Sequence, residues 1–289
     1  MIAGTKLRVL TASLLIPMVV AAIWWGPTAL VAAVAGLVAI AAMLEFFTMG
    51  ARLGFQAYRA WTCLAALGVF AQQWYAGQQA STARSGELLY SHFSPEFTLD
   101  LVLFVFLLGA AVIAFSSRRA LAEVFPSVSI SVAGLFVIAV PLSTVVRLHG
   151  VEVSGPKLLL FTAVLVWAGD SAAYFAGRSF GRVKLAPQLS PNKTWEGAIA
   201  NLLAALLVGV VFSDWTRIPL IHMLAMAVLG SVSGQMGDIF KSAFKRGVGV
   251  KDSGALLPGH GGMWDRIDAL IFAAPAVWYY FEWVVMKKY

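Results

Sequence analysis

The amino-acid sequence predicts an all-α integral membrane protein that crosses the bilayer several times. Of its 289 residues, 60% are hydrophobic and only 12% are charged, whereas soluble domains carry about 25% charged residues. The mean hydropathy is +0.81, and the apolar residues form long uncharged runs. A soluble fold could not bury so much apolar surface, so we expect these runs to lie in lipid as helices of about 20 residues each.

About nine such runs are expected to be transmembrane helices. They are continuously apolar, whereas the strands of a membrane barrel are about ten residues long and alternate in polarity. Helices also satisfy all of their backbone groups within one segment, as the bilayer requires. The predicted spans are near residues 8–25, 28–48, 60–77, 100–116, 124–146, 158–177, 196–213, 218–240 and 267–286.

The chain is expected to consist of three groups of helices. Residues 1–98 would hold the first three, residues 99–156 the fourth and fifth, and residues 157–289 the last four with two polar loops. The first apolar run continues past Pro27 into the second, so we expect it to be retained as a span and not cleaved as a signal peptide. Cys63, the only cysteine, lies within a span and cannot form a disulfide inside the chain.

Basic residues divide unequally between the two sides of this topology. With nine spans, 15 of the 21 Lys and Arg residues fall on the side of the N-terminus, and the other 6 fall opposite. The positive-inside rule therefore predicts that the N-terminus and its side are cytoplasmic. The net charge of +7 indicates a membrane surface or a phosphate-rich substrate, because the basic residues lie in short loops between apolar runs.

Two cytoplasmic segments differ in composition from the rest. Residues 178–196 and 241–268 are longer and rich in Gly, Pro, Lys, Arg and Asp. We therefore expect the active site, if there is one, on the cytoplasmic side of the C-terminal helices. The external segment 78–98 is also long, but its composition is plain, and we interpret it as a solvated loop.

Carboxylates at membrane depth are functional candidates, because their burial is costly. Asp170 lies in the sixth span and Asp238 near the end of the eighth, although each could instead form a buried ion pair or an interhelical hydrogen bond. Lys241, Ser242 and Lys245 follow Asp238 at i+3, i+4 and i+7. One helical face would then carry an acid, a hydroxyl and two ammonium groups.

The ninth span opens with a further pair of carboxylates. Asp265 and Asp268 share a helical face at i and i+3, although either could serve only to cap the helix and offset its dipole. The glycine-dense segment 258–262 before them could bind phosphate through backbone N–H groups, and His260 could accept a proton or contact phosphate. Glu45, in the second span, is interpreted as structural.

These groups suit a polyphosphate held by a divalent metal ion. Mg²⁺ is normally bound by one or two carboxylates together with substrate phosphate oxygens and water, and Asp238 and Asp265 suit that role. Motifs typical of P-loop proteins, zinc proteases and serine hydrolases are absent. Basic side chains would neutralise the remaining phosphate charge, and the candidates are Lys193, Lys245, Arg246, Lys251 and Arg266.

The last third of the chain resembles a known enzyme family. The run S-A-F-K-R at 242–246, K-D-S-G at 251–254 and L-P-G-H-G-G-M-W-D-R-I-D at 257–268 looks like the signature of the phosphatidate cytidylyltransferases, also called CDP-diacylglycerol synthases. It follows that pattern over all 27 positions. Residues 190–197 (S-P-N-K-T-W-E-G) and 170–174 also resemble the family, so the resemblance is strong over about 160–268.

The resemblance implies a homodimeric bacterial inner-membrane enzyme of phospholipid biosynthesis, with its N-terminus and catalytic loops in the cytoplasm. It would join CTP and phosphatidic acid to give CDP-diacylglycerol and pyrophosphate. Asp238 and Asp265 would be catalytic ligands of Mg²⁺, with a K⁺ ion possible beside it, and Lys245 would also be catalytic. The substrate-binding residues would be Ser190, Asn192, Lys193, Arg246, Lys251, His260, Arg266 and Asp170.

Two alternatives remain open. An anion or ion transporter also combines intramembrane Asp residues with basic loops, but it predicts charge through the depth of several spans, whereas here the charge clusters at one face. A related nucleotidyltransferase that acts on another lipid phosphate would share the chemistry. No nucleic-acid partner is expected.

Overall fold

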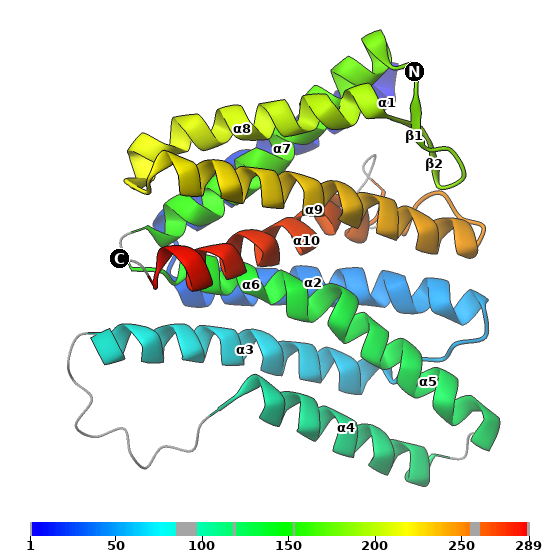
Figure 1. The fold of residues 1–289 in the computed structure, drawn as a ribbon. Coiled ribbons are helices and arrows are strands. Elements are labelled where there is room, and N and C mark those ends of the chain that lie inside the picture. Colours follow the sequence, from blue (N-terminus) through cyan, green and yellow to red (C-terminus); the bar gives the residue numbers. More distant parts are fainter. Residues whose placement is uncertain (1, 85–96, 118–119, 153, 255–260, 288–289) are drawn as a thin grey trace. The chain divides into compact units, whose positions relative to one another are not determined.

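The chain is helical almost throughout in the computed structural model, which describes residues 2–84, 97–117, 120–152, 154–254 and 261–287 (Figure 1). The first six helices are α1 (Ile2–Trp25), α2 (Thr28–Arg52), α3 (Arg59–Arg84), α4 (Leu99–Ser116), α5 (Leu121–Gly134) and α6 (Val140–His149). The others are α7 (Gly155–Phe180), α8 (Trp195–Thr216), α9 (Leu220–Gly247) and α10 (Trp264–Tyr280). Two π-helical segments, Leu135–Ala139 and Phe281–Val285, continue α5 and α10.

Every predicted span coincides with one of these helices or with a continuous helical rod, except that residues 218–219 precede α9 and residue 286 follows the last π-helical segment. Among the described residues, six helical segments are long and apolar enough to cross a membrane: Thr28–Arg52, Leu99–Ser116, Leu121–His149, Gly155–Phe180, Trp195–Thr216 and Leu220–Gly247. The prediction of a helical protein with several membrane spans is therefore confirmed. Spans at α1, α3 and α10, which would complete the nine, remain predictions.

The structure forms two compact units. One comprises Met1–Gly155 with Ser253–Trp264, and the other comprises Pro156–Asp252 with Asp265–Tyr289. The chain therefore returns to the first unit for a short segment before it enters α10. The grouping of the helices at residues 98 and 156 remains a prediction.

In the first unit, α5 and α6 form one rod through a π-helical segment, and α2 packs against this rod and against α3 (Figure 1). The wider π turn ends next to Pro141, which has no N–H group and whose ring would clash with the carbonyl of residue 137 in a regular α-helix. The rod therefore passes the proline without breaking. Gly134 allows the ring of Phe47 to pack directly against the rod, because a Cβ on Gly134 would lie 2.5 Å from that ring.

In the second unit, α8 and α9 lie side by side (Figure 1). A Cβ on Gly209 would lie only 3.2 Å from the backbone oxygen of Met223, which shows how closely the two helices approach, as is typical where small residues line membrane helices. The helices α9 and α10 also approach closely at Gly237, where an added Cβ would lie 2.6 Å from the backbone oxygen of Asp268. This close approach brings the charged ends of α9 and α10 together.

Three segments differ from the loops that were predicted, and in the first of them, 78–98, residues 78–84 continue α3. Residues 178–196 contain an antiparallel hairpin of β1 (Lys184–Ala186) and β2 (Ser190–Thr194), in which Lys184 pairs with Thr194 and Ala186 with Ser190. Residues 241–247 continue α9, because no helix-breaking residue occurs before Gly247, and Gly249 then adopts a positive φ of 73°. The basic residues from Lys241 to Arg246 therefore lie on a helix, as the predicted helical face of Asp238, Lys241 and Lys245 requires, and only the predicted start of the loop at residue 241 was wrong.

Candidate functional site

The hairpin is fixed to the start of α8 by side-chain caps. Thr194, the N-cap residue, accepts a hydrogen bond from the backbone N–H of Gly197 (3.2 Å), one of the donors that a helix start leaves unpaired. The carboxylate of Glu196 accepts hydrogen bonds from the backbone N–H groups of Arg182 (3.0 Å) and Val183 (3.2 Å). These bonds hold both strands at the helix start and so position Lys193, which directly precedes the cap.

Six charged side chains from β2, α9 and α10 form a continuous ion-pair network. The ammonium of Lys193 pairs with Asp238 (2.7 Å), and that of Lys245 pairs with Asp265 (2.6 Å). Lys241 joins the two pairs: its Nζ lies 3.4 Å from Asp238 and 3.2 Å from Asp265, and it also pairs with Asp268. Three ammonium groups therefore balance three carboxylates.

The network is buried at one end and exposed to solvent at the other. The side chains of Lys241, Asp265, Asp268 and Lys245 are 7–12% exposed, whereas those of Lys193 and Asp238 are 23% and 35% exposed. Charges this buried need close partners, because removing an ion from water costs several kcal/mol. The accessible end, at Lys193 and Asp238, is where a charged ligand can enter.

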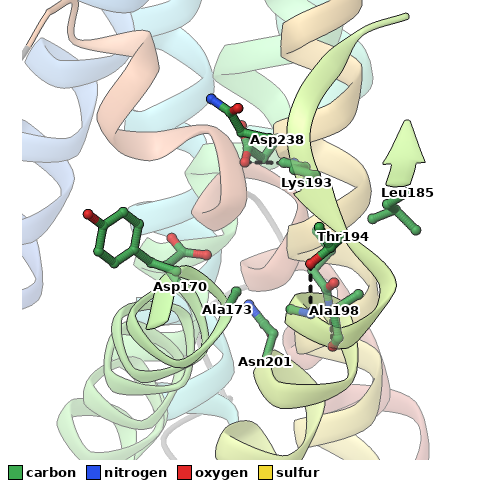
Figure 2. A pocket seen from close by; sticks show the side chains of 12 residues that line it. Asp170, Ala173, Leu185, Lys193, Thr194, Ala198, Asn201 and Asp238 are labelled. Atoms are coloured by element: carbon green, nitrogen blue, oxygen red, sulfur yellow. Dashed lines mark hydrogen bonds and ion pairs between the residues drawn. The ribbon is translucent and has the colours of Figure 1, made fainter. Parts of the chain in front are cut away.

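A pocket of about 350 Å³ opens at Lys193 and Asp238 (Figure 2). Its volume is within the range of small-molecule sites. Figure 2 shows Asp170 and Ala173 of α7 lying across the pocket from Lys193, Thr194 and Ala198. The lining residues come from α7, the hairpin, α8 and α9: Asp170, Ala173, Tyr174, Leu185, Asn192, Lys193, Thr194, Gly197, Ala198, Asn201, Gln235 and Asp238.

Two side-chain amides, of Asn201 and Gln235, line the pocket, and both bond to the buried hydroxyl of Ser231. Ser231 donates a hydrogen bond to the Oδ1 atom of Asn201 (2.8 Å) and accepts one from Nε2 of Gln235 (3.2 Å). The same Nε2 atom lies 3.4 Å from the backbone oxygen of Ala198. Gly169 leaves space for these hydrogen-bonded side chains, since a Cβ there would lie 2.7 Å from Asn201 Oδ1. The pocket therefore has a charged mouth and a neutral polar wall.

The structure brings together six of the residues predicted for the site. Asp170, Asn192, Lys193 and Asp238 line the pocket, and Asp265 and Lys245 belong to the ion-pair network. Ser190, Arg246, Lys251 and Arg266 lie outside the pocket lining, and the part of the remaining predicted residues in substrate binding remains a prediction. Ser190 pairs with Ala186 in the hairpin, Arg246 donates from Nε to the backbone oxygen of Leu189 (3.2 Å), Lys251 and Arg266 are exposed, and His260 is outside the described residues.

Four residues of this region were not predicted as site residues. Lys241 is the centre of the network. Its position at i+3 from Asp238, on the same helical face, could have indicated that it pairs with this carboxylate. Asp268, for which capping and function were both open, forms an ion pair with Lys241. Asn201 and Gln235 could have been recognised as uncharged polar side chains within membrane helices, which usually hydrogen-bond between helices.

The carboxylates can accept a cation between them. Asp238 and Asp265 share the ammonium of Lys241 at 3.4 Å and 3.2 Å, so a single positive charge already lies within reach of both. Within the described ranges, no group of three or more His, Cys, Asp and Glu side chains is arranged to hold a metal ion. Mg²⁺ commonly takes one or two carboxylates and completes its shell with phosphate oxygens and water, and its binding by Asp238 and Asp265 remains a prediction.

Comparison with known proteins identifies one family whose model spans most of the chain, and relatives that match nearly half of it. The model of the family described as "Cytidylyltransferase family" matches residues 6–284. A phosphatidate cytidylyltransferase of Haemophilus influenzae is 44% identical over 137 residues, covering 45% of this chain and 48% of the relative.

Proteins of the same name from Bacillus subtilis and Brucella suis are 39% identical over 136 residues and 44% identical over 143 residues. These alignments cover 46% and 49% of this chain and 51% and 53% of the relatives. The matched part of the chain therefore spans about half the length of each of these curated relatives.

Proposed function

The chain belongs to the cytidylyltransferase family, and on that premise we propose that it transfers the cytidylyl group of CTP to phosphatidic acid in phospholipid biosynthesis. Relatives that share 39–44% identity with it carry the name phosphatidate cytidylyltransferase. The observation that carries the proposal is the ion-pair network of Lys193, Asp238, Lys241 and Asp265, which opens into a pocket of about 350 Å³.

In the proposed reaction, an oxygen of the lipid phosphate attacks the α-phosphorus of CTP. The bond from that phosphorus to the bridging oxygen of the β-phosphate breaks, and pyrophosphate leaves with CDP-diacylglycerol as the other product. The lipid phosphate is itself a competent nucleophile, so no covalent intermediate on a Ser or Cys side chain is required. The protein's tasks are to hold the two phosphates in line and to stabilise their charge.

We propose that Lys193 and Lys245 are the side chains that contact phosphate oxygens. Each ammonium now pairs with a carboxylate, Asp238 and Asp265 respectively. We propose that these two carboxylates hold Mg²⁺, which when bound would stabilise negative charge on the phosphate oxygens, and a K⁺ ion beside it follows from the family resemblance. Both lysines would donate charge-assisted hydrogen bonds to phosphate.

The test of this function is transfer of labelled cytidylyl groups to lipid. Purified protein in phosphatidic acid micelles with Mg²⁺ and [α-³²P]CTP should yield a labelled lipid that extracts into chloroform, with one pyrophosphate released for each lipid labelled. Absence of labelled lipid would contradict the proposal. If label passes to a polyprenyl phosphate and not to phosphatidic acid, the enzyme acts on another lipid phosphate.

The proposed topology places Lys193 and Lys251 in the cytoplasm and residues 78–98 outside the inner membrane, because 15 of the 21 basic residues then lie inside. Single cysteines introduced on a Cys63→Ala background test it. An impermeant maleimide added to intact cells should label position 80 and not position 251. Labelling of position 251 would reverse the orientation. A homodimer, implied by the resemblance, also remains a proposal.

Lys193→Ala should weaken substrate binding more than turnover. Its ammonium is at the open end of the network (2.7 Å from Asp238), and loss of a charged hydrogen bond worth about 1.5–3 kcal/mol should raise the KM for CTP or phosphatidic acid by about 10- to 100-fold. Lys184→Ala is the matched control, because Lys184 is exposed on the other strand of the hairpin. Steady-state kinetics of the two variants should differ; equal KM values would remove Lys193 from the site.

A further inference from the structure

The carboxylate of Glu45, in α2, binds the backbone that leads into α10. Its Oε1 atom accepts a hydrogen bond from the N–H of Met263 (2.8 Å), and its Oε2 atom accepts one from the N–H of Trp264 (3.1 Å). The hydroxyl of Ser253 also donates to Oε2 (2.8 Å). All of these residues belong to the first compact unit, so a side chain distant in sequence holds the segment between α9 and α10.

Two glycines of this segment make room for the carboxylate. A Cβ on Gly254 would lie 2.5 Å from Glu45 Oε1, and a Cβ on Gly262 would lie 2.3 Å from Oε2. Both distances are far below van der Waals contact. The ring of Trp264, which is 2% exposed, also packs edge-on against Phe46 at a centroid distance of 5.4 Å. At Gly254 and Gly262, the absence of a side chain therefore leaves the space that the Glu45 carboxylate fills.

The bonds formed by Glu45 match the needs of a helix start. The first N–H groups of a helix have no partner within the helix, and a negative charge near them is favourable because of the helix dipole. A carboxylate within a membrane helix is costly, and the partners of Glu45 among the described residues are neutral donors. That cost is offset only while Ser253, Met263 and Trp264 stay in place.

We propose that Glu45 is a positioning residue for the transfer reaction, because it fixes the backbone from which Asp265 projects. Trp264 and Asp265 are joined by one peptide bond, so a shift of the Trp264 N–H displaces Asp265 with it. This inference rests on the proposed function of Asp265. It does not require Glu45 to touch a substrate, and it replaces the interpretation of Glu45 as merely structural.

The test compares Glu45→Gln with Glu123→Gln, which removes an exposed carboxylate from the first turn of α5. Glutamine offers one acceptor oxygen where glutamate offers two, so one of the two N–H groups loses its partner. Hydrogen exchange of peptides covering residues 261–264 should then be about tenfold faster than in the control, since one hydrogen bond is worth about 1 kcal/mol or more.

Activity gives the second readout. In Glu45→Gln, kcat should fall by about 10²-fold, because a catalytic group displaced by about 1 Å can cost that much, while the KM for CTP should change by less than about threefold. Exchange and kcat equal to those of Glu123→Gln would overturn the proposal. The exchange measurement needs no turnover, so a failure of the proposed function would be recognised separately, as absence of CDP-lipid with wild-type protein.

Two further variants keep the proposal testable if Glu45→Gln does not accumulate. Ser253→Ala removes one of the three donors and should accelerate exchange and lower kcat severalfold; unchanged values would count against the proposal. Gly254→Ala should lower kcat in the wild-type background, but it should add little in a Glu45→Ala background, where its clash is gone. Independent, additive losses would show that the glycine and Glu45 do not act together.

Discussion

Asp265→Asn should lose most of its turnover and retain its fold. Asparagine keeps the size of the side chain but removes the negative charge that pairs with Lys245 at 2.6 Å and Lys241 at 3.2 Å. If Asp265 holds Mg²⁺ with Asp238, kcat should fall by about 10²- to 10³-fold, the range seen when one group that stabilises transition-state charge is removed. The Mg²⁺ concentration needed for half-maximal activity should rise as well.

Asp268→Asn is the matched control for this prediction. Asp268 is as buried as Asp265 and shares the partner Lys241, but it is not proposed as a metal ligand. The two variants should therefore lose similar thermal stability in detergent, and only Asp265→Asn should change the Mg²⁺ dependence. Near-normal turnover of Asp265→Asn at ordinary Mg²⁺ concentration would contradict the assignment of Asp265 as a metal ligand.

Asp238→Asn should behave like Asp265→Asn, since both carboxylates reach the same ammonium of Lys241. Losses at residues that act as one unit are strongly non-additive. The double variant should therefore be little slower than either single variant. Multiplied losses would indicate that the two carboxylates work independently, and so would contradict a shared metal site.

The helices were predictable because a chain segment in lipid must pair its backbone N–H and C=O groups internally, which only helices and closed barrels achieve. Each uncharged run had to satisfy its own backbone, and each lies in a helix of the structure. The hairpin was missed for a physical reason. Its strands have three and five residues, β2 contains Pro191, and neither shows the polar and apolar alternation by which strands are recognised. The Glu196 carboxylate bonds to the N–H groups of Arg182 and Val183, which precede it by 14 and 13 residues, and no local pattern encodes these contacts.

The charged part of the site was predictable to the extent that helical spacing brought its members together. Lys241 and Lys245 follow Asp238 on α9, and Asp265 and Asp268 lie together on α10. Helical periodicity alone therefore grouped the residues within each helix. Which residues would meet across helices depends on how closely α9 and α10 approach, which Gly237 determines. The bonds of Glu45 to Ser253 and Met263 span 208 and 218 residues, and no local pattern encodes such a contact.

Lys241→Met should strongly destabilise the protein in the absence of Mg²⁺. The ammonium of Lys241 lies within ion-pair distance of Asp238, Asp265 and Asp268, and the residue is only 5% exposed. Methionine is of similar length but uncharged, so three neighbouring carboxylates would lose their common partner. Breaking a buried ion pair in this way costs about 3–5 kcal/mol, and the melting temperature in detergent with EDTA should fall accordingly.

Added Mg²⁺ should reverse much of that loss, because the vacated position suits a cation and the competing ammonium is gone. A ligand that binds only the folded state stabilises it by about 2.7 kcal/mol at 100 times its Kd, so the melting temperature of Lys241→Met should rise steeply with Mg²⁺, without CTP or lipid present. Lys157→Met is the control, because Lys157 instead donates to the backbone oxygen of Trp215 (3.0 Å). If Mg²⁺ raises both melting temperatures equally, Asp238 and Asp265 do not form a metal site.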